Sequence, residues 1–193
     1  MQAFFVKADA AGQSISMEYA DQKHSSNEFW KETQKSIETL KLSLKTDTSE
    51  NNTYFQFRED ATGGFDSHCD GYKLYGYGTI PLIYSQWNQL RYSINCLPYS
   101  TETISVPLGI QIIANGTLSI DFSGLDSFEE SVSIHLEDLQ TGQTSDIKQN
   151  PTYSFEANTN QAALRFVLHF NGVDALEELL ETAPNVFRES TDL

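Results

Sequence analysis

The sequence contains few basic residues. There are 12 Lys and Arg against 27 Asp and Glu, which gives a formal net charge of −15. A protein that holds nucleic acid through its phosphates needs a cationic surface, so this balance predicts no nucleic-acid partner. An anionic membrane surface is disfavoured for the same reason. The excess of acids instead favours solubility and, among small ligands, hard cations that bind carboxylate oxygens.

Long apolar runs are also missing. No stretch approaches the roughly 20 residues that cross a bilayer, so we expect no membrane insertion. The first residues lack a basic segment followed by an apolar core, and they do not predict a secretory signal peptide. Hydrophobic residues make up 39% of the chain, which is typical of a globular protein. Its 193 residues allow one large domain or two small ones.

Cysteine is scarce as well. Cys69 and Cys96 are too few for a disulfide framework, and their spacing matches no metal-binding motif. A disulfide requires a short separation between the two Cα atoms, which the sequence does not give. A bridge between Cys69 and Cys96 therefore stays open at this point.

Alternation of apolar and polar residues is the dominant pattern. It has the period of two that is typical of strands with one buried face. The windows with this pattern are Ile37–Leu44, Thr53–Phe57, Leu90–Ile94, Leu118–Phe122, Val132–Leu136, Tyr153–Phe155 and Leu164–Phe170. Turn signals such as Asn115-Gly116 and Thr141-Gly142 separate them. Such spacing favours a sandwich or barrel over βαβ units.

We therefore predict an all-β fold, an antiparallel β-sandwich of jelly-roll-like form over residues 1–172. It forms one domain or two packed sheet units with a break near 98–106. Residues 173–193 place Val173, Leu176 and Leu179 at helical spacing, which predicts a short helical C-terminal tail or linker. Proline at the "VPLG" segment, Val106–Gly109, favours an edge strand there. Arg165, beside aromatic residues in a buried strand, is expected to pair with an acid.

The densest polar cluster lies between two strand-like runs, at residues 58–71. Asp60, Asp66 and Asp70 are separated by glycines that let the backbone turn inward, so they are candidate calcium ligands. Their order does not follow the calcium-loop pattern of helix–loop–helix proteins. The alternative is a solvated loop whose acids cap turns, with Arg58 or Lys73 as an ion-pair partner.

Aromatic residues in loop-like stretches suggest a second kind of site. Trp30, Tyr77 and Trp87 are amphipathic rings that can stack on the faces of sugars. Trp87 lies in the polar turn "SQWNQ" between two strands, which favours exposure. We therefore consider these three residues as candidates for binding a glycan or another cell-surface ligand.

Catalytic patterns are weaker. A glycoside hydrolase needs two carboxylates roughly 5–9.5 Å apart, and one sequence does not fix that distance. No G-x-S-x-G is present, and no Ser/His/Asp set can be assembled without distances. His135 and His169 alternate with apolar neighbours and are expected on the outer faces of their strands. The sequence predicts no enzyme, with a carboxylate-based glycosidase as the remote alternative.

Several short motifs recur in a fixed order along most of the chain. They are "QAFFVKA" (Gln2–Ala8), "EDATGGFDSHCDGYKL" (Glu59–Leu74), "YSINCLP" (Tyr92–Pro98), "VPLG" (Val106–Gly109), "LEDLQTG" (Leu136–Gly142), "YSF" (Tyr153–Phe155) and "RFVLHF" (Arg165–Phe170). Together this order resembles the β-sandwich region that precedes the C-terminal type IX secretion sorting signal in Bacteroidetes surface and secreted proteins. The resemblance spans about residues 2–170.

The resemblance implies an extracellular, non-catalytic module that adjoins other domains of a longer chain. It would serve adhesion or structural spacing next to a sorting signal, and a carbohydrate-binding module is the alternative. No sorting-signal domain follows the predicted tail, so export by this pathway is an inference about a longer parent protein. The resemblance supplies no ligand.

Overall fold

The computed structural model describes residues 10–16, 18–19, 37–75 and 78–173. The chain divides into two compact units, Met1–Gln34 and Lys35–Leu193, and all the described strands belong to the second. Two of the predicted ligand-binding rings, Trp30 and Tyr77, lie outside the described residues, as does the predicted helical tail beyond Val173. Within the described residues, no helix has the length and apolar character that a membrane span requires.

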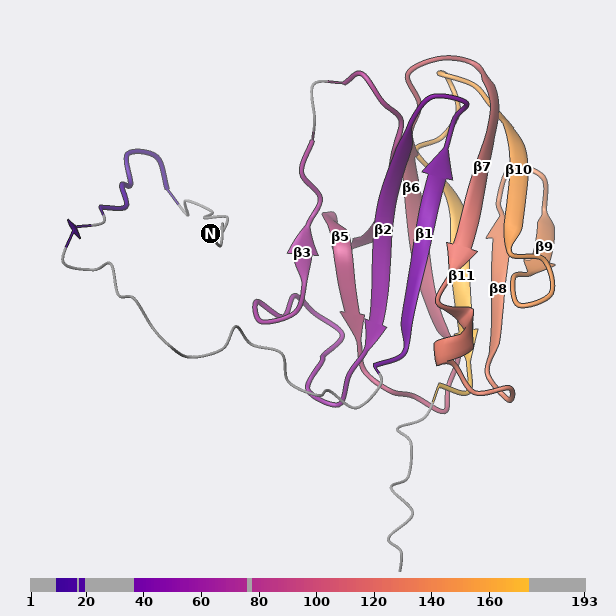
Figure 1. The fold of residues 1–193 in the computed structure, drawn as a ribbon, viewed down its shortest axis with the longest axis horizontal. Coiled ribbons are helices and arrows are strands. Elements are labelled where there is room, and N and C mark those ends of the chain that lie inside the picture. The colour runs from indigo at the N-terminus through magenta and orange to yellow at the C-terminus, as the bar shows by residue number, and fades with distance from the viewer. Residues whose placement is uncertain (1–9, 17, 20–36, 76–77, 174–193) are drawn as a thin grey trace, which may run out of the picture. The chain divides into compact units, whose positions relative to one another are not determined.

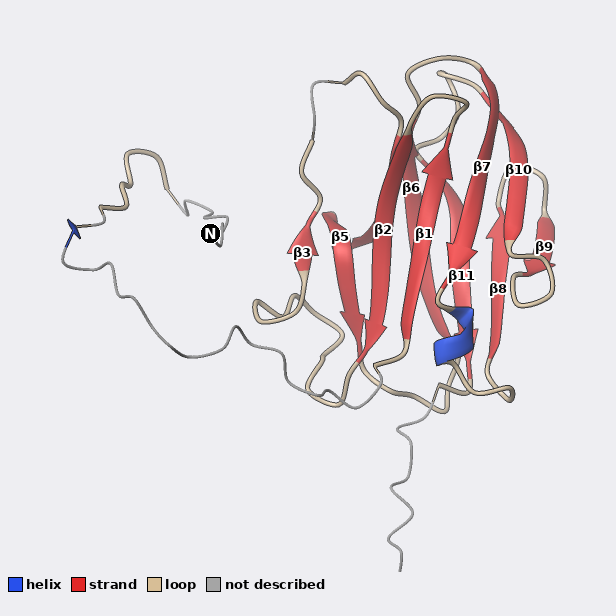
Figure 2. Ribbon diagram, viewed as in Figure 1, coloured by secondary structure: helices blue, strands red, loops and turns tan. Residues whose placement is uncertain are grey.

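The second unit is nearly all β, and its strands form one sheet (Figures 1 and 2). The strands are β1 (Thr39–Lys45), β2 (Glu50–Phe57), β3 (Gly71–Tyr72), β4 (Leu82–Trp87), β5 (Leu90–Leu97), β6 (Ile104–Gln111), β7 (Gly116–Ser123), β8 (Ser133–Asp138), β9 (Gln143–Asp146), β10 (Thr152–Ala157) and β11 (Leu164–Asn171), with a 3₁₀ turn at Leu125–Ser127. Their order is β10-β7-β1-β2-β5-β4-β6-β11-β8-β9, and β3 pairs separately with β5.

The sheet is mixed rather than purely antiparallel. β2 and β5 run parallel, with Tyr54 opposite Ile94 and Phe57 opposite Leu97, while the other paired strands of the described sheet are antiparallel. The prediction of an entirely antiparallel fold is therefore wrong at this pair. A parallel pair needs a long connection, and here residues 58–89, with β3 and β4, provide it.

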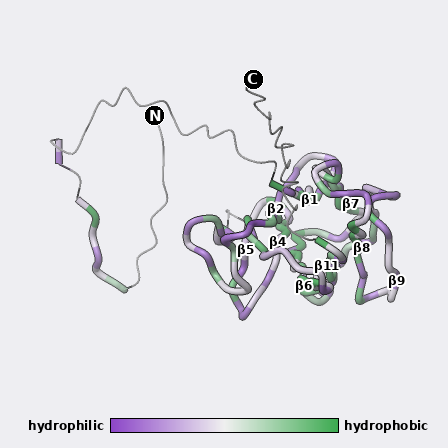
Figure 3. Tube along the Cα trace, turned by 90° about the horizontal axis from the view of Figure 1, so that it is seen from below, coloured by the Kyte–Doolittle hydropathy of each residue, from purple (hydrophilic) through white to green (hydrophobic). Residues whose placement is uncertain are grey.

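The sheet curls over one hydrophobic core until it nearly closes on itself. β2 and β11 are far apart in the strand order, yet the rings of Phe55 and Phe57 lie 5.6 Å and 5.0 Å from the ring of Phe170. Figure 3 shows the hydrophobic parts of the trace gathered between β2 and β8. Leu97, just before the expected break near 98–106, and Val106, at its end, both belong to this core.

The alternating windows are confirmed as strands, since they overlap β1, β2, β5, β7, β8, β10 and β11. The expectation for the "VPLG" segment is wrong, because β6 lies between β4 and β11. Pairing with β4 stops at Leu108, however, and Pro107 is the next residue. Pro107 therefore lies where β6 has already lost one neighbour, and this is a position that tolerates a missing N–H.

Gly109 lies directly opposite Tyr84 in the β4–β6 pair, and it gives space to the tyrosine ring. A Cβ on Gly109 would lie 2.1 Å from Cε2 of Tyr84. The ring is buried and carries the Arg91 guanidinium 4.7 Å from its centroid, so it has little freedom to move away. Tyr84 and Gly109 therefore pack β4 against β6, its neighbour in the middle of the strand order.

We predict that Gly109→Ala lowers the free energy of unfolding by about 1–3 kcal/mol, the usual cost of overpacking a buried site. Chemical denaturation measures the loss. Gly63→Ala is the control, because no atom lies within 4 Å of a Cβ added there. In a Tyr84→Leu background the cost of Gly109→Ala should shrink, and an unchanged cost would contradict the proposed clash.

Candidate functional site

The acidic loop at residues 58–71 covers β5, and Asp60 is held at its start. The Arg58 guanidinium donates through Nε to Oδ1 of Asp60 at 2.8 Å and through Nη2 to Oδ2 at 3.1 Å. Nε2 of His68 lies 3.1 Å from the same Oδ2. The hydrogen bonds from Arg58 lower the pKa of Asp60 to about 2. The expected pairing of Arg58 with a loop acid is confirmed.

Asp66 and Asp70 organise the rest of the loop. Asp66 accepts hydrogen bonds from the backbone N–H of Thr62 at 2.6 Å and from its hydroxyl at 3.0 Å. Asp70 accepts one from the N–H of Asp66 at 2.7 Å and one from the N–H of Cys96 at 2.6 Å. Burial raises the pKa of Asp70. Asp70 thus ties the loop to β5.

The three predicted calcium ligands therefore have different partners. Asp66 and Asp70 are neighbours, whereas Asp60 binds Arg58 and His68. Across the described residues, the ligand atoms close enough to share one ion belong instead to Cys69, Asp70 and Cys96, and all lie within 4.8 Å of one another. The sequence did not indicate this cluster, because Cys96 reaches it from another strand.

Lys73, immediately after β3, is buried, and its described hydrogen bonds are to amide oxygens rather than to an acid. Its Nζ donates to Oδ1 of Asn51 at 2.7 Å and to the carbonyl of Asn52 at 3.0 Å. Burial lowers the pKa of Lys73 to about 8. Asn51 Oδ1 also accepts the N–H of Ile83, so these contacts join β3, β2 and β4. We therefore interpret Lys73 as a structural residue that holds these strands together.

Trp87 ends β4 at a tight hairpin, as its polar surroundings predicted. Asn88 and Gln89 both have positive φ values, 44° and 66°, and Trp87 pairs with Leu90 across the turn. Two left-handed residues match the twist of a two-residue hairpin. The indole is 46% exposed.

A hollow of about 190 Å³ lies beside this indole, and we call it the Trp87 hollow. Its lining comes from the acidic loop, the β4–β5 hairpin and the start of β6. The lining residues are Thr62, Gly63, Gly64, Trp87, Tyr92, Asn95, Leu97, Pro98, Ile104, Ser105 and Val106. Apolar walls with a few polar groups are typical of small-ligand sites.

Tyr92 is the unusual member of this lining. Its ring is buried and lies near the stacked rings of Phe65 and Tyr72, whose centroids are 4.2 Å apart. Its hydroxyl is buried and has no hydrogen-bond partner among the described residues. A buried hydroxyl without a partner costs free energy, so such groups are rare in folded proteins.

Ser105, His169 and Glu137 form a chain of hydrogen bonds on the outer face of β6, β11 and β8. Nδ1 of His169 lies 2.8 Å from the Ser105 hydroxyl, and Nε2 lies 3.0 Å from a carboxylate oxygen of Glu137. In a serine hydrolase the acid binds Nδ1 and the nucleophile binds Nε2. Here the two partners are exchanged, and we interpret the chain as a cross-strand polar ladder.

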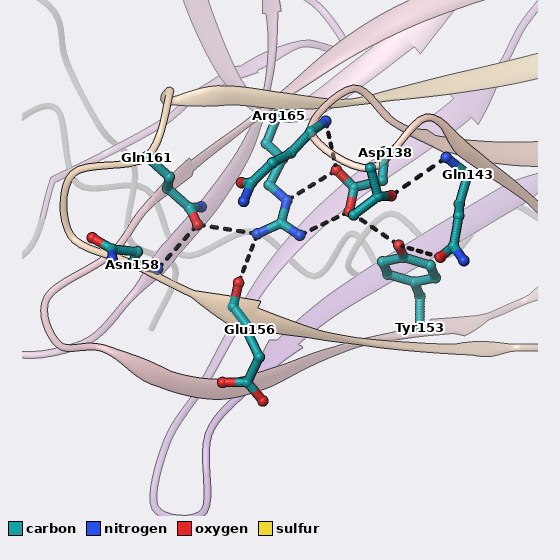
Figure 4. Close-up of polar contacts among 9 residues, drawn as sticks. Asp138, Gln143, Tyr153, Glu156, Asn158, Gln161 and Arg165 are labelled. Atoms are coloured by element: carbon teal, nitrogen blue, oxygen red, sulfur yellow. Dashed lines mark hydrogen bonds and ion pairs between the residues drawn. The ribbon is translucent and has the colours of Figure 1, made fainter.

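A buried ion pair joins β11, β8 and β10 (Figure 4). Arg165 donates to both carboxylate oxygens of Asp138, at 3.0 Å and 2.8 Å, and through Nη1 to the carbonyl of Glu156 at 2.8 Å. The Tyr153 hydroxyl donates to Asp138 at 3.0 Å. We call these four residues the seam cluster, because β10 is one end of the strand order and β8 lies next to the other.

The seam cluster confirms that Arg165 pairs with an acid. Nη1 of Arg165 also donates to Gln161 at 3.1 Å, so all three guanidinium nitrogens have acceptors. Burial raises the pKa of Asp138, but the hydrogen bonds from Arg165, Gln140 and Tyr153 outweigh it and leave the pKa below its usual value. We therefore interpret the seam cluster as structural, because it links β10 to β8 and β11 where the sheet nearly closes.

Comparison with known proteins gives one family. No curated protein and no solved structure matches the chain. Residues 1–170 match a family described as a domain of unknown function (DUF8693). This match covers the acidic loop, the Trp87 hollow and the seam cluster. The chain is therefore a member of the DUF8693 family.

Proposed function

We propose that this chain is a non-catalytic binding module whose Trp87 hollow takes one sugar unit of a glycan. The observation that carries the proposal is a half-exposed tryptophan beside a hollow that Tyr92 also lines, and the buried hydroxyl of Tyr92 has no hydrogen-bond partner among the described residues. An indole face stacks on the apolar face of a sugar ring. A sugar hydroxyl that reaches Tyr92 would supply the missing hydrogen bond.

Other polar groups of the lining support a sugar over a purely apolar ligand. Asn95 is fixed by a hydrogen bond from its side-chain amide to the Ser85 hydroxyl at 3.1 Å. Ser105 is fixed by His169. Groups that are held before the ligand arrives lose little freedom on binding, and this improves affinity.

The charge of the chain favours a neutral sugar. The net charge is −15, and the acidic loop that forms one wall of the hollow carries Asp60, Asp66 and Asp70 nearby. Juxtaposed like charges oppose association, so uronic or sialic acids are disfavoured. We propose neutral hexoses and N-acetylhexosamines as the ligand class.

The absence of a carboxylate from the hollow supports a non-catalytic role. The described residues that line it include no Asp or Glu, and hydrolysis of a glycosidic bond commonly uses a pair of them. We further propose that the nearly closed sheet is a jelly-roll-like sandwich. The chain would act in adhesion or spacing as an extracellular module of a longer surface protein, adjoining a type IX sorting signal.

The test is a glycan array followed by calorimetric titration of the neutral sugars that bind. We expect Trp87→Ala to abolish binding while Tm stays within about 2 °C, because the side chain is half-exposed. Leu90→Ala is the matched control, since Leu90 is 38% exposed across the same hairpin but does not line the hollow. It should bind as the unaltered chain does.

Tyr92→Phe separates binding from packing. Loss of the hydroxyl should weaken sugar binding about tenfold, the equivalent of one hydrogen bond of about 1.4 kcal/mol. Stability should not fall, because the hydroxyl has no partner to lose. A blank array, or sugar binding that survives Trp87→Ala, would reject the proposal and leave structural spacing as the role.

A further inference from the structure

The two cysteines approach each other where the acidic loop meets β5. Cys69 and Cys96 are free, and their Sγ atoms lie within 4.8 Å of each other. Cys69 is half-buried in the loop, whereas Cys96 is buried in β5. The separation in sequence is wide, so the fold itself brings them together.

Strand pairing explains the approach. Gly71 of β3 lies opposite Ile94 of antiparallel β5. Cys69 lies in the turn that precedes β3, and this register, continued two residues back from Gly71, would set it opposite Cys96. Opposed residues of antiparallel strands have Cα atoms roughly 4.5–5.5 Å apart, within the range that a disulfide spans. The bond from the Cys96 N–H to Asp70 holds the loop at this point.

We propose that Cys69 and Cys96 form an intramolecular disulfide that fixes the acidic loop to β5. The oxidant is a small-molecule or protein disulfide. The Cys69 thiolate attacks one of its sulfurs and releases a thiol, which gives a mixed disulfide. The Cys96 thiolate then attacks Cys69 Sγ and releases the second thiol. Two electrons pass to the oxidant, and the two cysteine protons end on the two released thiols.

The surroundings favour a disulfide over a metal ion at this place. Both oxygens of Asp70 already accept backbone N–H groups, which leaves the two sulfurs as the principal free ligands. Burial raises the pKa of both thiols, so the thiolate is scarce at neutral pH. Bridging removes two ionisable groups from an acidic, partly buried site. The reaction should accelerate as pH rises, because thiolate is the attacking species.

The experiment uses the full chain, reduced and then equilibrated with oxidised glutathione at pH 8.5. We expect the protein to lose both alkylatable thiols and to yield one cross-linked peptide pair, with no glutathione retained. Tm should rise by about 5–10 °C, because the bridge closes a long loop of the unfolded chain. Cys69→Ser should show no Tm response to the same treatment.

A second variant, Cys69→Ala with Cys96→Ala, gives the stability of the fold without thiols and should match the reduced protein within a few degrees. Three results would overturn the proposal. Both thiols could remain alkylatable after equilibration, or glutathione could stay attached to Cys69. Alternatively, zinc could raise the Tm of the reduced protein and protect both thiols, which would assign the pair to a metal site.

Discussion

Replacement of Arg165 by alanine is expected to lower the free energy of unfolding by about 3–5 kcal/mol. The substitution leaves the carboxylate of Asp138, fully buried, without the two hydrogen bonds that compensate its charge. It also frees the carbonyl of Glu156 from its contact with Nη1. Chemical denaturation measures the loss. A change below about 1 kcal/mol would mean that solvent already reaches the pair.

A double variant distinguishes loss of the pair from loss of one charge. Asp138→Leu with Arg165→Met removes both charges and keeps apolar volume, so it should be close to neutral or even stabilising. If the double variant is as unstable as Arg165→Ala, geometry at the seam matters more than uncompensated charge. The comparison requires no assumption about the absolute worth of the ion pair.

The pH dependence gives a further check on Asp138. Its pKa is lower in the folded chain than in the unfolded one. The stability it contributes is therefore present above the unfolded pKa, near 4, and is lost as pH falls through the folded pKa. The double variant lacks this group, so its stability should fall less steeply than that of the unaltered chain below about pH 4.

The second large effect is expected for Phe170→Ala, at about 3–5 kcal/mol. Phe170 is fully buried, and its ring contacts the rings of Phe55, Phe57 and Phe128 at centroid distances of 5.6, 5.0 and 6.4 Å. These contacts connect β11 to β2 across the core, where the sheet has no backbone pairing between the two strands. Removal of the ring leaves a cavity that both strands line.

Two controls define this effect. Phe170→Leu keeps most of the volume and should cost clearly less, because a smaller cavity remains. Leu139→Ala removes an apolar side chain that is 53% exposed and should change stability by no more than about 0.5 kcal/mol. An equal loss for Phe170→Ala and Phe170→Leu would show that the site relaxes around the missing atoms.

The sequence predicted the strands that have one solvent-exposed face and one buried face. The sequence did not predict β4, because its first four residues, Leu82–Ser85, are all buried and show no alternation. β9, at the end of the sheet, is polar throughout and also shows none. The parallel pairing of β2 with β5 depends on contacts far apart in the chain, which local periodicity does not contain.

For the candidate sites, local signals worked for features that one short segment carries, such as the pair of Arg58 with Asp60, and for the expectation that Arg165 pairs with an acid. Trp87 could be placed in its hairpin because the surrounding residues are polar. The partner of Asp70 could not be foreseen, since this carboxylate binds the backbone of Cys96 on another strand. The same holds for the Tyr92 hydroxyl, whose lack of a partner is visible only in three dimensions.

The seam cluster also bears on self-association. β10 pairs with β7 on one side, and on the other it meets β8 and β11 through the side chains of Tyr153 and Arg165 rather than through a backbone ladder. An uncovered strand edge is a template onto which another chain can add. If the cluster opens, β10 presents such a template. Arg165→Ala should therefore promote aggregation below its unfolding temperature, whereas the intact ion pair keeps β10 joined to β8 and β11.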